Sequence, residues 1–398
     1  MMIERQLGKE LKECAAEFPV VTLLGPRQSG KTTLARASFP DYQYRLLEAP
    51  DVRRLAVEDP RGFLAGCGVG AVIDEIQRVP ELLSYIQEIV DRDHRPGRFI
   101  LTGSHQPELS HAVSQTLTGR TAVLTLLPLS LEELRAAGKK IKAFEVCMSG
   151  FYPVLHTGKA SAERFFPGYM QTYLERDVRS LVNLRDLGAF QKFLRLLAGR
   201  TGQLVNYSAL SSDIGVSGTT LKNWIEVLKA SFVVFELQPF SAGIRKRLVK
   251  SPKLFFTDVG LVSYLLGIRS ADQLERDPLR GSIYENLVVA EFLKQGLNRG
   301  IQPELYFYRD SNGNEVDLII KERHTLFPVE VKSAATFTPG FIRGISSFKS
   351  TVGDRSGKGI LLYNGDRQFT FKDVKVMNPV THGLPGPGNE NGSCFPFE

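Results

Sequence analysis

The fold of the N-terminal third of the chain is decided by the stretch Gly25-Pro26-Arg27-Gln28-Ser29-Gly30-Lys31-Thr32-Thr33. Two glycines separated by four residues, followed by a lysine and a hydroxyl residue, are typical of a phosphate-binding loop. The apolar run Val20–Leu24 before it predicts a buried strand, and the residues from Thr32 onward predict a helix. A strand, a glycine loop and a helix N-terminus form an anion site, so the stretch predicts a bound nucleoside triphosphate.

The residues of this loop have distinct expected roles. Gly25 and Gly30 allow the backbone N–H groups to surround a polyphosphate where a Cβ would block the approach. We expect Lys31 to act as a catalytic cation on the β- and γ-phosphates and the Thr32 hydroxyl to hold Mg²⁺. Thr33 is expected mainly to pack. The predicted ATP-binding set is Gly25, Pro26, Arg27, Gln28, Ser29, Gly30, Lys31, Thr32, Thr33, Thr102 and Arg120.

A second apolar strand, Gly70–Ile73, ends in two adjacent carboxylates. In a parallel sheet such a carboxylate points into the crevice that holds the ligand, so we expect Asp74 to bind Mg²⁺, through water. Glu75 is then the candidate base that orients a water for attack on the γ-phosphate. The alternative is a strand end with solvated acids.

Two further elements have weaker patterns. The strand Arg98–Leu101 ends in Thr102-Gly103-Ser104, whose hydroxyls are suited to sensing the γ-phosphate or to capping a helix. Arg120, before the apolar strand Ala122–Leu127, is a candidate arginine finger or sensor, and the alternative is an ordinary surface charge.

Composition limits the class of protein. A chain of 398 residues with 42% hydrophobic content predicts two or three domains. Cys14, Cys67, Cys147 and Cys394 are scattered without a CxxC pair, which indicates inert thiols in a reducing compartment. With no apolar run long enough for a bilayer, a cytoplasmic protein with no membrane partner is expected. The formal charge of +7 permits a polyanionic partner without establishing one.

A family resemblance rests on four stretches: GPRQSGKTTL, VIDEIQRVP, LTGSHQ and LTGRTAVLTLLPLSLEEL. They resemble the AAA-type ATPases (AAA_14 domain) that are fused to a C-terminal region called DUF4143. The similarity extends through most of the chain. It implies an α/β protein with a P-loop AAA-type ATPase domain over residues 1–142, with ATP and Mg²⁺ as cofactors.

The middle of the chain, residues 143–270, predicts linker helices and then a helix-turn-helix. Residues 164–182 resemble the family's connecting helices, and two helices meet near Gly215 before a strand that suggests a wing. If this winged-helix-like module reads DNA, the groove-facing residues are Thr219, Thr220, Lys222 and Asn223, and the phosphate contacts are Arg245, Lys246, Arg247, Lys250 and Lys253. Protein contacts are the alternative use of this fold, and Trp224 is expected in the core.

Residues 271–383 predict the element order helix, three strands, helix, strand. Period two places Glu330 and Lys332 on one face of a strand, with Asp317 beside them on its neighbour. An Asp and a Glu held together repel each other unless a divalent cation lies between them. The arrangement resembles the restriction-endonuclease-like PD-(D/E)xK core, which implies Asp317, Glu330 and Lys332 as catalytic and Glu285, Asp317 and Glu330 as metal ligands. The alternative is a solvated strand face with a Glu330–Lys332 ion pair.

The sequence thus predicts a Mg-dependent ATPase whose ATP turnover is coupled to a DNA-binding-like and nuclease-like C-terminal region. The alternative is a nucleotide-switched DNA- or protein-binding regulator whose nuclease-like domain is catalytically inactive. DNA as a partner and assembly into a homo-oligomer both stay open. Residues 384–398, rich in Gly, Pro and Asn, are expected to be a disordered tail.

Overall fold

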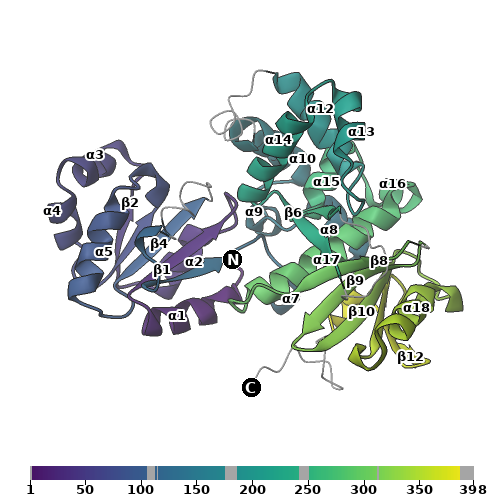
Figure 1. Ribbon diagram of the computed structural model, residues 1–398. Coiled ribbons are helices and arrows are strands. Elements are labelled where there is room, and N and C mark those ends of the chain that lie inside the picture. Colours follow the sequence, from purple (N-terminus) through teal and green to yellow (C-terminus); the bar gives the residue numbers. More distant parts are fainter. Residues whose placement is uncertain are drawn as a thin grey trace.

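The computed structural model describes residues 2–104, 113, 115–174, 186–241, 251–311 and 313–385. These residues form an N-terminal α/β domain and a larger second body (Figure 1). Some predictions fall outside the described residues: the distal part of the connecting helix, the tail from residue 386, and the phosphate contacts Arg245, Lys246, Arg247 and Lys250.

The N-terminal domain contains a five-stranded, fully parallel sheet in the order β2-β3-β4-β1-β5. The strands are β1 (Val20–Gly25), β2 (Gln43–Leu46), β3 (Ala71–Asp74), β4 (Phe99–Ser104) and β5 (Thr121–Thr125). The helices are α1 (Leu7–Glu17), α2 (Lys31–Ser38), α3 (Pro50–Glu58), α4 (Pro60–Ala65) and α5 (Leu82–Arg92), with a 3-10 turn at Ile76–Arg78. The strands predicted around the glycine loop and the paired carboxylates are confirmed.

Helices cover both faces of this sheet. Successive side chains of a strand point to opposite faces, so Val21 and Leu23 pack in the cluster that contains α1 and α2 residues. Val20 and Leu24 pack in the opposite cluster, which contains residues of α3, α4 and α5. Burial on both sides explains why β1 is apolar nearly throughout.

The parallel arrangement gathers the predicted site at one edge of the sheet. Gly25 at the end of β1 lies in register with Ser104 at the end of β4, and Ile73 of β3 lies in register with Leu101. The carboxyl ends of parallel strands share an edge, so the glycine loop, Asp74 and the hydroxyl residues after β4 meet there.

The first part of the second body is helical. Its helices are α7 (Leu131–Ala136), α8 (Ala143–Ser149), α9 (Pro153–His156), α10 (Ala162–Tyr169), α12 (Leu187–Ala198), α13 (Tyr207–Ile214) and α14 (Gly218–Ala230), with a π-helical turn at Met170–Leu174. The predicted pair of helices joined at Gly215 is present as α13 and α14. Gly215 has a φ of 85°, a left-handed conformation that ends α13 at little steric cost.

The second body also contains an eight-stranded mixed sheet in the order β12-β13-β11-β10-β9-β8-β6-β7. The strands are β6 (Val234–Pro239), β7 (Lys253–Phe256), β8 (Leu305–Arg309), β9 (Glu315–Glu322), β10 (Thr325–Lys332), β11 (Gly359–Tyr363), β12 (Phe369–Phe371) and β13 (Val374–Met377). The helices are α15 (Val259–Leu265), α16 (Ala271–Arg276), α17 (Arg280–Leu297), α18 (Arg343–Val352) and α19 (Pro379–His382), with 3-10 turns at Pro339–Ile342 and Gly353–Arg355. The predicted element order is confirmed, and β12 and β13 extend it.

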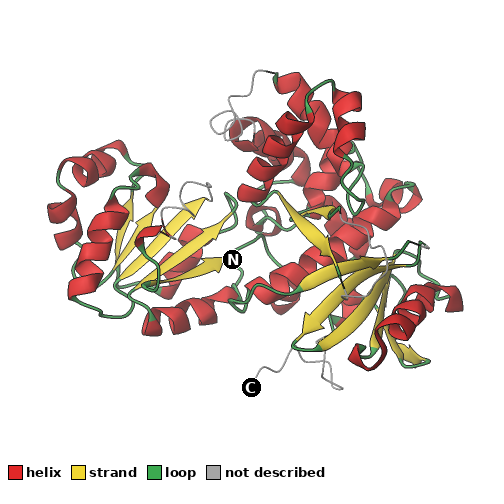
Figure 2. Ribbon diagram, viewed as in Figure 1, coloured by secondary structure: helices red, strands yellow, loops and turns green. Residues whose placement is uncertain are grey.

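This sheet crosses residue 270, where the sequence suggested a domain boundary. Strand β6 pairs in parallel with β8 through Gln238 opposite Tyr306 and Pro239 opposite Phe307. One apolar cluster contains residues from Leu129 to Val380. The helices and the mixed sheet therefore share a core. Figure 2 shows the strands of this sheet beside the helices of the second body.

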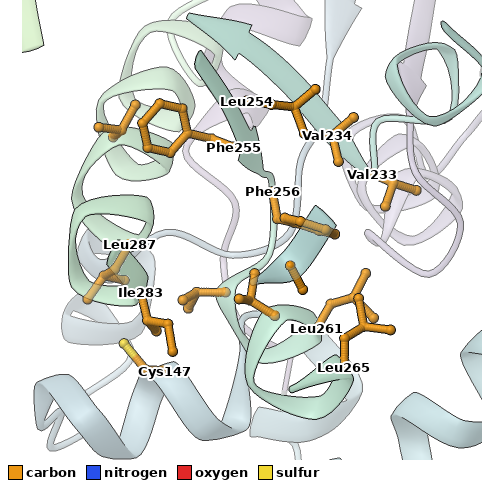
Figure 3. Packing of buried hydrophobic residues seen from close by; sticks show 14 of the residues in the cluster. Cys147, Val233, Val234, Leu254, Phe255, Phe256, Leu261, Leu265, Ile283 and Leu287 are labelled. Atoms are coloured by element: carbon orange, nitrogen blue, oxygen red, sulfur yellow. The ribbon is translucent and has the colours of Figure 1, made fainter. Parts of the chain in front are cut away.

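Figure 3 shows part of this shared core. Phe255 and Phe256 come from β7, Leu261 from α15, and Ile283 and Leu287 from α17. Trp224 of α14 belongs to the same cluster and is 4% exposed, which confirms its predicted place in the core.

Candidate functional site

The glycine loop after β1 has the conformation that its sequence predicts. Gly25 has a φ of 149°, and a Cβ there would lie 2.1 Å from the Leu126 carbonyl oxygen. Gly30 has a φ of 97°, a region that side-chain-bearing residues rarely adopt, and it directly precedes α2. Both glycines are therefore required for the path of the backbone.

Lys31 turns back over this loop. Its ammonium group donates to the carbonyl oxygens of Gly25 at 2.9 Å and Pro26 at 2.8 Å, and the residue is 6% exposed. Burial lowers the pKa of Lys31 to about 8, although the carboxylates of Asp74 and Glu75 favour the charged form. The ammonium is a buried cation that would gain from an anion placed at the loop.

Asp74 collects hydroxyl donors at the end of β3. It is 3% exposed and accepts hydrogen bonds from Thr32 at 2.9 Å, from Tyr44 at 2.6 Å, and from Thr102. The structure thus brings together three predicted site residues. Tyr44 was missed by sequence reasoning, because an aromatic residue on an edge strand gives no sign of the acid it will contact.

Glu75 follows in a left-handed conformation with a φ of 62°. Its carboxylate accepts a hydrogen bond from Gln77 and another from the Ser104 hydroxyl at 3.3 Å. Gln77 also donates to Ser104 at 3.0 Å. A non-glycine residue at positive φ costs conformational energy, and such residues cluster at functional sites. The structure therefore fixes Glu75 beside the loop, with Gln77 as an orienting residue that the sequence did not single out.

The remaining loop residues differ in exposure. Pro26 is buried, Arg27 is half-buried, and Gln28 is exposed at a φ of 60°. Ser29 is fully buried, and its hydroxyl has no hydrogen-bond partner among the described residues. Thr33 is exposed, so the expectation that it packs is wrong. The Ser29 hydroxyl, buried without a partner in the described part of the chain, is energetically costly, and it is the kind of group that a bound ligand satisfies.

Arg120 does not reach the glycine loop of its own chain. Its carbonyl accepts from the N–H of Val20, the first residue of β1, so it lies at the opposite edge of the sheet, about 17 Å from Gly25 at ~3.3 Å per residue. Its guanidinium pairs with Asp91 at the surface. Within this chain Arg120 is therefore a surface charge, because it lies beside the start of β1 and the glycine loop follows the end of that strand.

A second group of charged residues lies on the mixed sheet. Asp317 of β9 and Glu330 of β10 lie one residue beyond the last antiparallel pair, Leu318 with Val329, and Lys332 donates to Asp317 at 3.1 Å and to Glu330 at 2.6 Å. Gly344 of α18 covers Glu330, since a Cβ there would lie 2.1 Å from the Glu330 Oε1. The three predicted residues therefore meet, but Glu330 is only 5% exposed.

Lys253 completes this cluster from β7. Its ammonium lies 3.0 Å from Glu285 of α17 and 2.6 Å from Glu315 of β9, and the residue is 3% exposed. We expected Lys253 to contact DNA phosphates, and this expectation is wrong because the residue is buried against carboxylates. The sequence placed Lys253 in a basic run and gave no sign of its acidic partners.

The electrostatics of the cluster differ from group to group. Burial and the Asp317 carboxylate raise the pKa of Glu330 to about 9. Burial raises the pKa of Glu285 to about 7 despite Lys253. Burial opposes ionisation of Asp317 too, yet the ammonium groups of Lys332 and Lys253 hold the pKa of Asp317 below its usual value.

This arrangement does not fit a divalent cation as it stands. Within the described residues, no three His, Cys, Asp or Glu side chains are grouped so that they could hold a metal ion. The position between Asp317 and Glu330 is taken by the Lys332 ammonium. Cation binding would require that lysine to leave the buried Glu330 and the half-buried Asp317, which costs the energy of both ion pairs.

The start of α14 presents polar side chains. Thr219, Lys222 and Asn223 are exposed and Thr220 is half-buried, as a helix that reads a groove requires. Lys222 lies 5.6 Å from the centre of the Tyr207 ring. The same surface is equally suited to a protein partner.

Three family profiles match successive parts of the chain. They are an AAA domain over residues 17–135, a domain of unknown function (DUF8612) over 141–272 and a domain of unknown function (DUF4143) over 280–382. An uncharacterized protein of Mycobacterium tuberculosis is 31% identical over 387 residues, covering 96% of this chain and 84% of that protein. The chain belongs to the same family. An uncharacterized protein of Mycobacterium bovis matches with the same identity and coverage.

Among solved structures, a Walker-type ATPase of Pyrococcus abyssi is 17% identical, covers 66% of this chain and 96% of that chain, and has a TM-score of 0.44. The family matches confirm the AAA domain and the DUF4143 region that the sequence motifs suggested. Among the described residues, no helix combines the length and the apolar character needed to cross a membrane.

Proposed function

We propose that the N-terminal domain binds ATP together with Mg²⁺ and hydrolyses it. The observation that carries the proposal is the meeting of Lys31, Thr32 and Asp74 at the loop after β1, inside the AAA domain. The buried Lys31 ammonium supplies positive charge for the β- and γ-phosphates, and the buried Ser29 hydroxyl supplies a polar group that still lacks a partner.

The residues present fit Mg²⁺ at this site. The Thr32 hydroxyl and the Asp74 carboxylate lie 2.9 Å apart and are oxygen donors, which this hard cation prefers. Thr32 and Asp74 would hold the ion, with Thr102 and Tyr44 fixing the carboxylate. When bound, the ion neutralises charge on the phosphate oxygens.

Glu75 is the proposed base. Its carboxylate is held by Gln77 and Ser104 beside Asp74, so it is fixed before a substrate arrives. A carboxylate in this position accepts a proton from the attacking water as the bond to the γ-phosphorus forms and the bond to the β-phosphate oxygen breaks. Lys31 stays protonated and stabilises the charge that develops on the leaving phosphate.

The test is an ATPase and nucleotide-binding assay on paired variants. Lys31→Ala should abolish binding, whereas Glu75→Gln should bind ATP and lose hydrolysis by about 100-fold or more. Glu81→Gln is the matched control, because Glu81 is exposed on the same domain. Full ATP binding by Lys31→Ala would refute the site, and unchanged hydrolysis by Glu75→Gln would refute the base.

For the C-terminal cluster the geometry favours the nucleotide-switched regulator over the metal-dependent nuclease. The support for the regulator is that the carboxylates of the cluster already form ion pairs with lysines. Lys332 pairs with Asp317 and Glu330, and Lys253 pairs with Glu285 and Glu315. The nuclease stays a prediction with its own test, the cleavage of DNA and RNA by the wild type and by Lys332→Ala with Mg²⁺ or Mn²⁺, with and without ATP. Cleavage that depends on Lys332 would overturn the regulator.

A further inference from the structure

A line of buried charged groups joins the nucleotide loop to the second body, and it begins at Arg5. This arginine lies just before α1, ahead of the residues that match the AAA domain, and is 9% exposed. Its three guanidinium nitrogens donate to three separate segments. Nη1 donates to the Ser29 carbonyl at 2.6 Å, Nη2 to the Leu127 carbonyl at 2.7 Å, and Nε to Glu133 at 2.9 Å.

Glu133 links Arg5 to the N-terminus of α7, because it bonds both to Arg5 and to the capping residue Ser130. It is 1% exposed, and its second carboxylate oxygen accepts from the Ser130 N–H at 2.9 Å, while the Ser130 hydroxyl accepts from the Glu133 N–H at 3.1 Å. This reciprocal capping box fixes the first turn of the helix. The first oxygen also accepts from the Gln6 N–H at 2.9 Å. A shift of Arg5 therefore acts on a rigid helix end.

Helix α17 holds the same helix end from the other side. Glu291 accepts from the Leu131 N–H at 2.6 Å, and Lys294 donates to the Leu129 carbonyl at 2.9 Å. Glu291 and Lys294 pair with each other at 2.8 Å and are 3% and 1% exposed. The segment between the two bodies is thus bonded to Arg5 on one side and to α17 on the other.

Helix α17 also reaches the cluster of charged residues that contains Lys253 and Lys332. Glu285, which pairs with Lys253, precedes Glu291 by less than two turns of the same helix. Pro153 of α9 in the second body also lies close to the loop itself, since a Cβ on Gly30 would lie 3.9 Å from Pro153 and 3.7 Å from Arg5. The line of contacts thus runs from Ser29 in the nucleotide loop to Glu285 and Lys253 in the second body.

We propose that occupancy of the nucleotide loop is communicated to α17 through Arg5. The Ser29 carbonyl and the Gly30 N–H belong to one planar trans peptide and point in opposite directions. Arg5 holds the oxygen and thereby aims the N–H, so a phosphate that engages this N–H fixes the position of Arg5 and of α7 behind it. The inference rests on the proposed ATP binding and assigns Arg5 as a positioning residue.

The experiment measures amide hydrogen exchange in α17 of the full chain, with and without a saturating non-hydrolysable ATP analogue and Mg²⁺. In the wild type, nucleotide should slow exchange across residues 280–297 by about fivefold or more. Arg5→Gln should bind the analogue about tenfold more weakly and, at saturation, lose this protection. Arg61→Gln is the control, since Arg61 pairs with Glu88 at the surface of the same domain.

The outcomes separate this inference from the proposed function. If the wild type does not bind the analogue, ATP binding fails, and the coupling with it. If it binds but exchange in α17 is unchanged, or if saturated Arg5→Gln responds as the wild type does, only the coupling is overturned. A merely structural role for Arg5 would lower stability and keep the response. Should Arg5→Gln not fold, Glu133→Gln takes its place and must lose the same protection.

Discussion

The buried pair of Glu291 and Lys294 allows one prediction with a worked magnitude. Replacing Lys294 with Met removes its hydrogen bonds to Glu291 and to the Leu129 carbonyl, at 2.8 and 2.9 Å, and its ammonium contact 3.6 Å from the centre of the Phe151 ring. Glu291 is then a buried carboxylate without its cation. Breaking such a pair from one side costs about 3–5 kcal/mol of unfolding free energy.

The assay uses the single tryptophan of the chain. Trp224 belongs to the core that also contains Leu129 and Phe151, so its fluorescence in a urea titration follows the unfolding of the second body. Lys142→Met is the control, because Lys142 and Glu145 have the same i,i+3 spacing at an exposed site. We expect the control to lose less than ~0.5 kcal/mol.

Two further measurements test the physical reason. Glu291→Gln in the Lys294→Met background should restore much of the loss, since the amide oxygen still accepts from Leu131 and no charge is left buried. Burial raises the pKa of Glu291 above its ordinary 4.5, and the variant loses the lysine that opposes this. The folded variant then holds a proton that the unfolded chain releases above about pH 4.5, so its stability falls as pH rises. The deficit should be larger at pH 8 than at pH 5.

Two results would contradict this reasoning. One is a loss below about 1 kcal/mol for Lys294→Met, or one no larger than that of Lys142→Met. The other is a deficit that is the same at pH 5 and pH 8.

Three other predictions follow from single contacts. Gly25→Ala should lower nucleotide affinity by at least about tenfold in a binding titration, since its Cβ would lie 2.1 Å from a backbone carbonyl oxygen at a φ of 149°. Lys253→Met should cost about 3–5 kcal/mol in the same fluorescence assay, with partial recovery when Glu285→Gln is added. Burial raises the pKa of Cys14 to about 11 from 9.0, so with Cys394 replaced by serine its alkylation at pH 8 should be about 100-fold slower than that of a free thiol.

The geometry of the candidate nucleotide site was largely predictable from sequence because its parts are local. The glycines, Lys31 and Thr32 are consecutive, and Asp74 ends an apolar strand whose parallel pairing places it beside them. Turn chemistry and strand direction decide these positions, and both are visible in short stretches of sequence.

What could not be predicted depends on partners far along the chain. Arg5 meets Glu133 across 128 positions, and Lys253 meets Glu285 across 32. A lone arginine near the N-terminus or a lysine in a basic run resembles a surface charge, because hydropathy patterns do not say which acid a buried cation will contact. Pairing of β6 with β8 was missed for the same reason, and with it the continuity of the second body.

The pairing of β6 with β8 also bears on how the chain is made. Pro239 and Leu305 are separated by roughly 65 residues, which a ribosome adds in about 3–13 s at ~5–20 residues per second. Until β8 emerges, the end of β6 that pairs with it, Gln238–Pro239, has no neighbouring strand on that side, and such a free strand edge can pair with another nascent chain. The antiparallel pair of β6 and β7 is therefore a segment that is open to such pairing during synthesis.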